Sequence, residues 1–383
     1  MPRTTLQRFN NLSAVFFAAA TLAMGCGDDG TTGGTDAGPD GPTASGPTGY
    51  AVSGDFAVTG VFTAVDVAAG TVTPNALAGV AGGDPVLRRI GDELLIVNRD
   101  AGENVTVLGG TPLALVDQYG TGGGSNPQDV AVVGGKLYVP ALGSAGVVVI
   151  DRATRATTTI TIPGDPDGLP DCVSAYAVGA RVYVACGVLD ATFTPRGNGL
   201  VAVIDTATDT VATTFELPAP NPIGVFARAP LGTDLAGDLL IGTAPSFSDF
   251  STGCVTRVAV GATPHANGCL ISNQELGGLA NHVDVAPDDS VIWTAVTGYT
   301  PDFSSQFGRL RGLDPADGTP WPPTSTPAMQ IDDVAACPGG YVIAADGTMG
   351  ASGVRIWKDG VEQTTAPLDI GRPTGFGANL ICR

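Results

Sequence analysis

The sequence predicts an all-β fold built from a repeated unit. From Gly49 onward, short runs rich in Val, Ala and Ile are interrupted by Gly, Asp, Pro and Asn, and no segment keeps the apolar spacing of a helix. The order strand, glycine turn, strand, loop, strand, Asp turn, strand occurs twice in clear form, from Asn126 and from Leu169. A four-stranded unit that repeats about every forty to fifty residues is typical of a β-propeller.

The starts of the repeated units predict the number of blades in residues 50–383. Six first strands fall inside the chain, beginning at Asp84, Asn126, Leu169, Asn221, Leu279 and Ile331. Tyr50 to Leu77 has strands two to four without a first strand, and Arg372 to Arg383 has a first strand alone. Together these ends predict a seventh blade that closes the ring and leaves no exposed sheet edge. Six or eight blades are the alternatives if one start is miscounted.

The N-terminal residues have the form of an export signal. Arg3 and Arg8 supply a short basic head, and the apolar run Leu12 to Gly25 is too short to span a bilayer as a stable helix. The small residues that end this run suit signal cleavage. We therefore predict that residues 1–25 are a signal peptide.

Cys26 and the polar stretch behind it predict a lipid anchor. Residues 27–49 are rich in Gly, Pro, Asp and Thr and contain no large apolar side chain, so residues 26–49 are expected to form a flexible tether. Signal, cysteine and tether together resemble those of a bacterial lipoprotein, whose cysteine is acylated. The resemblance implies a membrane-anchored protein of the periplasm or cell surface, with the outer membrane favoured. The alternative is an ordinary signal peptidase acting after Ala23-Met24-Gly25, which gives a soluble secreted protein.

The charge of the chain excludes several partners. The formal net charge is −19, and the only lysines are Lys136 and Lys358. A surface this acidic repels nucleic acid and anionic lipid headgroups. We therefore expect no nucleic-acid partner, and we expect any attachment to a membrane to depend on acyl chains alone. Solubility is the other interpretation of the acidity.

Seven cysteines become six if Cys26 carries lipid, and an even set suits an oxidising compartment. Their placement predicts three pairs, within one hairpin, within one strand–loop–strand segment, and between the last complete unit and the chain end: Cys172–Cys186, Cys254–Cys269 and Cys337–Cys382. The sequence has no CxxC or HExxH motif and only two histidines, which removes the ligands of zinc-finger, haem and zincin sites.

Residues 125–218 carry the clearest repeat motifs. Pro127-Gln128-Asp129-Val130-Ala131-Val132, Leu137-Tyr138-Val139 and Val201-Ala202-Val203-Ile204-Asp205-Thr206-Ala207-Thr208 are similar to the YVTN-type propeller repeat. This family resembles surface-layer, periplasmic and lactonase-like propellers. The resemblance implies the fold, and it leaves the function open.

Three consecutive connections between second and third strands are predicted to be long: Gly187–Gly199, Thr243–Cys254 and Val296–Arg309. They concentrate aromatic residues and arginines in a chain that is only 6% aromatic, and long loops on a rigid scaffold often bind partners. The binding-face candidates are Phe193, Arg196, Phe247, Phe250, Tyr299, Phe303, Phe307 and Arg309. The alternative is that these rings pack beneath their own loops.

A second candidate site is the mouth of the central channel. Aligning the first strands at a fixed spacing gathers polar residues there: Gln128, Asp129, Asp171, Asn281, His282, Asp332 and Asp333. Their carboxylates suit a hard cation such as calcium, or they cap strand ends as turn residues. His282 beside Asp332 or Asp333 is the one candidate general base.

The sequence therefore favours a tethered, monomeric, non-catalytic propeller that binds or scaffolds a protein, peptide or glycan of the cell envelope. No catalytic residue, resident metal or cofactor is predicted, with calcium as the one cation considered. A propeller enzyme, lactonase-like or quinone-dependent, is the first alternative. A structural envelope protein is the second.

Overall fold

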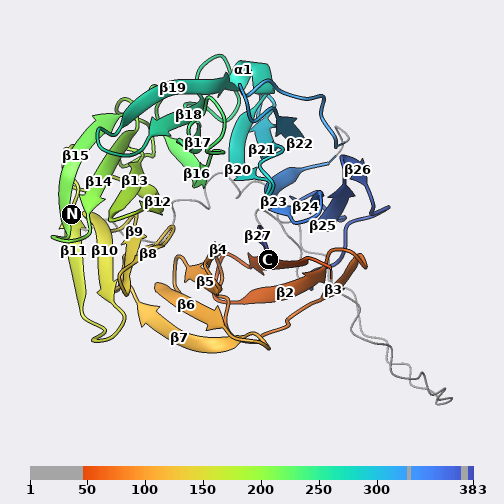
Figure 1. Ribbon diagram of the computed structural model, residues 1–383, viewed down its shortest axis with the longest axis horizontal. Helices are drawn as coiled ribbons and strands as arrows, with labels where there is room; N and C mark the ends of the chain where they lie inside the picture. The colour runs from red at the N-terminus through yellow and green to blue at the C-terminus, as the bar shows by residue number, and fades with distance from the viewer. Residues whose placement is uncertain (1–45, 326–328, 372–377) are drawn as a thin grey trace. The chain divides into compact units, whose positions relative to one another are not determined.

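Seven antiparallel sheets are arranged in a ring, as predicted (Figure 1). The computed structural model describes residues 46–325, 329–371 and 378–383, so Cys26, the predicted signal peptide and most of the predicted tether lie outside the described residues. Among these residues the one helix is α1 (Asn273–Leu276). None of the described helices is long and apolar enough to cross a membrane.

We number the blades in chain order and give their strands from the centre of the ring outward. Blade 1 contains β27 (Asn379–Cys382), β1 (Thr48–Gly54), β2 (Gly60–Asp66) and β3 (Thr71–Thr73). Blade 2 contains β4 (Pro85–Ile90), β5 (Glu93–Asn98), β6 (Asn104–Gly109) and β7 (Ala114–Gly120). Blade 3 contains β8 (Ala131–Val133), β9 (Lys136–Pro140), β10 (Gly146–Asp151) and β11 (Thr157–Thr161). Blade 4 contains β12 (Cys172–Val178), β13 (Arg181–Cys186), β14 (Leu200–Asp205) and β15 (Thr210–Glu216).

The remaining blades follow the same order. Blade 5 contains β16 (Pro222–Arg228), β17 (Leu239–Thr243), β18 (Cys254–Ala259) and β19 (His265–Ser272). Blade 6 contains β20 (Leu279–Val285), β21 (Ile292–Tyr299) and β22 (Gln306–Leu313). Blade 7 contains β23 (Ile331–Cys337), β24 (Tyr341–Asp346), β25 (Gly353–Lys358) and β26 (Val361–Glu362). Blade 6 thus has three strands where four were predicted, because Pro320 makes only an isolated bridge to Leu313 in the fourth position.

The two chain ends close the ring in the predicted way. β27 pairs antiparallel with β1, in a register that places Gly49 opposite Cys382. β1 begins at Thr48, slightly before the predicted boundary at Tyr50. The Cys337–Cys382 disulfide then joins blade 7 to blade 1, and Cys172–Cys186 and Cys254–Cys269 complete the three predicted pairs.

The hydrophobic core of the described residues consists of seven buried clusters, one between each pair of neighbouring blades. The cluster between blades 4 and 5, for example, packs Tyr183 and Val201 against Phe226 and Leu239. Each such side chain contributes about 1.5–3 kcal/mol when it is fully buried. Since every sheet depends on both neighbours, closure of the ring matters to all seven blades.

Candidate functional site

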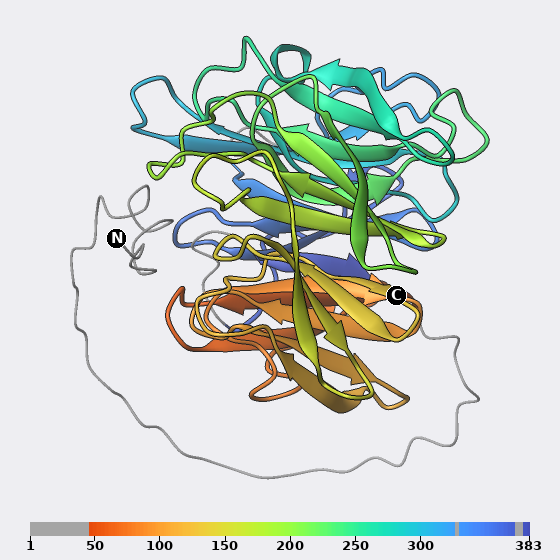
Figure 2. The same cartoon turned by 90° about the vertical axis from the view of Figure 1, so that its left-hand side faces the viewer.

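The predicted loops and the starts of the first strands share one face of the ring, which we call the upper face. In blade 6, Leu279 at the start of β20 pairs with Thr297 near the end of β21, and blade 7 repeats this arrangement with Ile331 and Asp346. The turns between first and second strands lie on the opposite, lower face. Figure 2 shows the stacked sheets from the side, with loops at both ends of the strands.

Six of the eight binding-face candidates lie in contacting segments of blades 5 and 6. Phe250 packs edge-on against Phe307 with ring centroids 5.8 Å apart, and the guanidinium of Arg309 lies 5.3 Å from the Phe307 centroid. Tyr299 and Phe303 are 5.7 Å apart. We call Phe247, Phe250, Tyr299, Phe303, Phe307 and Arg309 the aromatic cluster.

The third predicted loop is largely a hairpin. β21 extends to Tyr299 and β22 starts at Gln306, so the connection is only residues 300–305. Two glycines of this hairpin, Gly298 and Gly308, are needed for close packing. A Cβ at Gly298 would lie 2.4 Å from the Phe250 ring, and one at Gly308 would lie 2.3 Å from the backbone of Ile331.

Phe193 and Arg196 lie in the loop of the neighbouring blade 4. The guanidinium of Arg196 is 3.3 Å from Asp167 and 4.0 Å from Asp165, in the connection between β11 and β12. Phe193 is partly buried, with a left-handed backbone at φ 63°. The ion pairs of Arg196 hold its own loop in place. The residues of the aromatic cluster come from the two following blades, 5 and 6.

Asp332 lies where the aromatic cluster adjoins the channel mouth. Its Oδ1 accepts a 3.3 Å hydrogen bond from Gln306, which pairs with Tyr299 in the hairpin, and its backbone oxygen accepts one of 2.7 Å from Asn281. Burial, with repulsion from Asp333 and Asp346, raises the pKa of Asp332 to about 8. At neutral pH the Asp332 carboxyl is therefore mostly protonated and able to donate a hydrogen bond.

The other predicted channel-mouth residues bind the protein itself. Gln128 donates to the side chain of Asn126 at 2.7 Å, and Asp171 accepts from the backbone of Leu189 at 3.0 Å. The side chain of Asp129 is 1% exposed and accepts from Arg88 Nε at 2.5 Å. These contacts support the capping interpretation of these carboxylates.

Asp129 belongs to a series of side chains that join the first strands of neighbouring blades. Each hydrogen bond runs from a backbone N–H of one first strand to a side-chain oxygen in the first strand of the preceding blade or, for Asp129, in the segment that leads into β8. Five are found among the described residues: Ala175 to Asp129 (2.9 Å), Phe226 to Ser174 (2.9 Å), Ala336 to Asp284 (2.8 Å), Leu380 to Asp333 (2.8 Å) and Leu87 to Asn379 (3.4 Å). We call these side chains the inter-blade caps. They satisfy backbone donors that have no strand partner on the channel side.

A fixed spacing along the first strands missed Ser174 and Asp284. Both lie two residues beyond the aligned position that Asp129 and Asp333 occupy, and both accept the inter-blade hydrogen bond from there. Bulges in β12, β20 and β23 do not separate the two cases, because Asp333 caps from the aligned position although β23 is bulged as well. The signal available in the sequence was a polar residue in an otherwise apolar first strand.

His282 is tied to Asp333 through its Nδ1. Burial alone lowers the pKa of His282, but the charge of Asp333 and the hydrogen bond to it outweigh burial and raise the pKa. The contact ties the ring to Asp333, which is itself bonded to the backbone of β27. The geometry thus favours a structural role for this pair.

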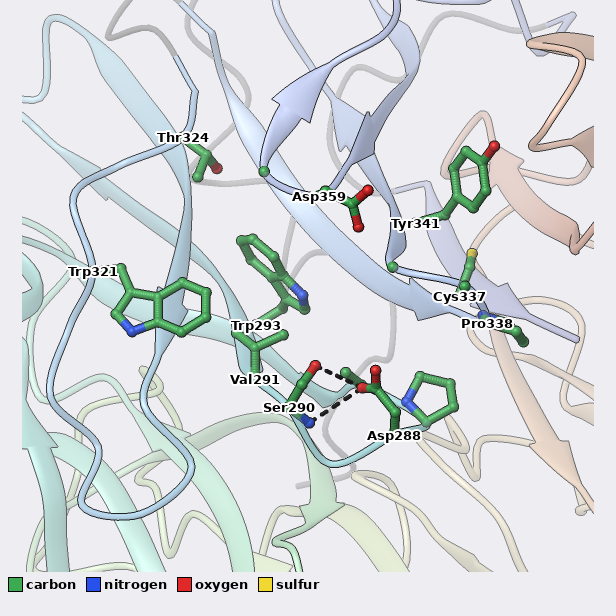
Figure 3. A pocket seen from close by; sticks show the side chains of 15 residues that line it. Asp288, Ser290, Val291, Trp293, Trp321, Thr324, Cys337, Pro338, Tyr341 and Asp359 are labelled. Carbon is green, nitrogen blue, oxygen red and sulfur yellow. Dashed lines mark hydrogen bonds between the residues drawn. The ribbon is translucent and has the colours of Figure 1, made fainter.

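Two cavities formed by the described residues bear on function. One of about 550 Å³ lies in the channel below Asp129 and His282 and includes Arg88, Tyr176, Arg228 and Asp284. The other, of about 510 Å³, is a largely apolar groove between blades 6 and 7 on the lower face, with Trp293 and Trp321 edge to face at 6.2 Å (Figure 3). There Ser290 donates to Asp288 at 2.6 Å and closes the turn that borders the groove.

The described residues contain no group of three His, Cys, Asp or Glu side chains placed to hold a metal ion. The carboxylates predicted for calcium already accept bonds from the protein, as Asp129 and Asp333 illustrate. Hard cations need several oxygens that converge on one point. In the described channel mouth, the acceptors instead face strand backbones and side-chain donors.

Comparison with known proteins gives the fold. No family model matches the chain, and no curated protein matches it by sequence. Citrobacter koseri AztD is similar in structure, with 11% identity over 88% of this chain and 98% of that chain, at a TM-score of 0.51. A functionally unknown protein from Desulfotomaculum acetoxidans is similar at 9% identity over 87% of this chain and 98% of that chain, with a TM-score of 0.52. Likeness at this level of identity shows a β-propeller and no more.

Proposed function

We propose that this protein is a membrane-tethered, extracytoplasmic binding module of the YVTN-propeller type, and that its aromatic cluster holds a protein, peptide or glycan of the cell envelope. The proposal rests on one observation: side chains from the loop of blade 5 and the hairpin of blade 6 come together to form the aromatic cluster. Aromatic rings beside an arginine are favoured anchors of recognition surfaces, because they bury much area with little loss of side-chain entropy.

The exposure of the cluster supports binding over a purely internal packing role. Phe303 is 51% exposed, and its ring lies 5.7 Å from that of Tyr299, which is partly buried. An exposed ring on a packed base combines a rigid support with surface free to contact a partner. The three disulfides are in keeping with an oxidising, extracytoplasmic location.

Capture from envelope extracts tests the binding proposal. Phe303→Ser should weaken capture of a bound partner and leave the melting temperature near that of wild type, because the ring is half exposed. Leu115→Ser is the matched control, since Leu115 is 57% exposed in the outer strand β7, away from the cluster. Equal capture by both variants and the wild type would place binding elsewhere.

Cys26 carries the anchoring part of the proposal. Cys26→Ala should move the protein from the membrane fraction to the soluble fraction and abolish labelling by a fatty-acid analogue. Wild-type protein that partitions into the aqueous phase of a detergent separation would contradict lipidation and favour secretion.

A further inference from the structure

We call the cavity of about 550 Å³ in the channel the lower channel. It combines positively charged side chains with few free hydrogen-bond acceptors. Three of its lining residues are arginines, Arg88 and Arg89 from β4 and Arg228 from β16. The whole chain carries a formal net charge of −19, with 18 lysines and arginines against 37 acids. Three arginines against two carboxylates, Asp129 and Asp284, line one cavity of about 550 Å³, which locally reverses the acidic excess of the chain.

The channel carboxylates are already occupied by protein donors. Asp129 accepts from Arg88, from the Ser174 hydroxyl at 2.8 Å and from the backbone N–H groups of Val130 and Ala175 at 2.7 and 2.9 Å. The inter-blade caps Asp284 and Asp333 each accept two backbone N–H bonds, and Asp333 also accepts from His282. Little acceptor capacity is left to face the cavity.

Donor capacity, in contrast, is left over. Arg88 Nη2 and Arg228 Nε are buried and have no hydrogen-bond partner in the described part of the chain. A buried donor without a partner costs about 1–3 kcal/mol, so a small shift of these side chains toward an acceptor in the cavity would be favoured. Gly237 leaves room for the guanidinium of Arg228, since a Cβ at Gly237 would lie 3.0 Å from Arg228 Nε.

Neighbouring ionisable groups increase the positive character of the cavity. Burial raises the pKa of Asp284, which favours its neutral form, and Asp333 raises the pKa of His282, which favours its cation. Tyr176 lies close enough to Arg228 for the arginine to oppose the rise that burial gives the pKa of the phenol. Arg228 and Tyr176 thus form one polar corner of the channel.

We propose that the lower channel is a binding site for a small oxyanion, a compound with a carboxylate or phosphate group, held by Arg88, Arg228 and Tyr176. Arginine pairs with both groups through two parallel hydrogen bonds, and its attraction is strong where water is partly excluded. The cavity volume lies in the range that encloses small molecules. This site is separate from the aromatic cluster and does not depend on it.

Titration calorimetry of the full chain tests the proposal, with citrate and inorganic phosphate as probes and glycerol as the neutral control. We expect one or both anions to bind and glycerol to give no heat of binding. Binding by citrate alone would assign a carboxylate ligand, and binding by phosphate alone would assign a phosphate ligand. Absence of binding by both anions at millimolar concentration would overturn the site.

Variants place the binding in the channel. Arg228→Gln should lower the affinity for the probe about tenfold, because one charge-assisted contact is lost. Arg228→Lys should retain part of the affinity. Arg155→Gln is the matched control, since Arg155 is 59% exposed on the outside of the ring. Arg228 is preferred to Arg88, whose loss would also unpair buried Asp129. A folded Arg228→Gln protein that binds as tightly as wild type would contradict the proposal.

Discussion

The backbone N–H of Tyr299 donates a 2.8 Å hydrogen bond to the backbone oxygen of Phe247. This bond fixes the hairpin of blade 6 to the long loop of blade 5 by main-chain atoms alone. The rings of the aromatic cluster therefore stand on a support that does not depend on their own packing. A loop held in this way loses little further entropy when it binds a partner.

Gly298 tests the packing inside the aromatic cluster. Gly298→Ala places a methyl group against the Phe250 ring, so Phe250 must move from its contact with Phe307. We expect a loss of about 1–3 kcal/mol in the free energy of unfolding, measured by urea denaturation. Ala at Gly120, where a Cβ meets nothing within 4 Å, is the control. Equal stability of the two variants would mean that the rings are not packed against Gly298.

The inter-blade caps predict a large effect at Asp129. Asp129→Ala removes four accepted hydrogen bonds and leaves the guanidinium of Arg88 buried without its partner. Breaking a buried ion pair from one side costs about 3–5 kcal/mol, which thermal and urea unfolding would detect. Asp117→Ala breaks the exposed pair with Arg155 and should change stability little. Similar losses at both sites would argue against a structural role of the caps.

Much of the fold could be predicted because local sequence patterns reveal the repeat. Alternating apolar runs and glycine turns gave the blade order, and the incomplete end units gave the closure by β27 and β1. The missing fourth strand of blade 6 could not be seen, because only contacts with the rest of the sheet distinguish a strand from an extended segment such as that around Pro320.

The candidate site was harder to predict, because function at the channel depends on register. Ser174 and Asp284 cap from positions two residues beyond those of Asp129 and Asp333 in the aligned first strands, so their capping roles do not follow from spacing. Arg88 and Arg228 were missed for another reason. They lie in different first strands and meet the same cavity only once the ring is closed.

The Cys337–Cys382 disulfide should stabilise ring closure more than a disulfide within a blade. Its cysteines are 45 residues apart, against 14 for Cys172–Cys186. Loop-closure entropy predicts losses of about 4 and about 3 kcal/mol, respectively, when each pair is changed to serine. Urea denaturation of the two double variants measures the difference. A smaller loss for Cys337–Cys382 would contradict the entropic account of closure.

Because the Asp332 carboxyl is buried, we expect its contribution to the stability of the folded protein to fall as the pH rises. Its pKa increases from 3.8 to about 8 on folding, so between these values the folded state holds a proton that the unfolded state has lost. The Asp332 contribution to the free energy of unfolding is therefore least favourable above the folded pKa. Asp332→Asn removes it, so wild type should lose stability relative to this variant as the pH is raised through that interval. Parallel pH profiles of the two proteins would contradict the burial of a protonated carboxyl.

Site-specific photo-crosslinking tests the central claim, that the aromatic cluster is the binding face. Benzoylphenylalanine in place of Phe303 keeps an exposed aromatic ring at the top of the cluster, and the same group in place of Leu115 reports on the outer edge of blade 2. After irradiation in intact cells, the account predicts a discrete crosslinked partner from position 303 and none from position 115. A partner crosslinked at 115 alone, or equally from both positions, would contradict it.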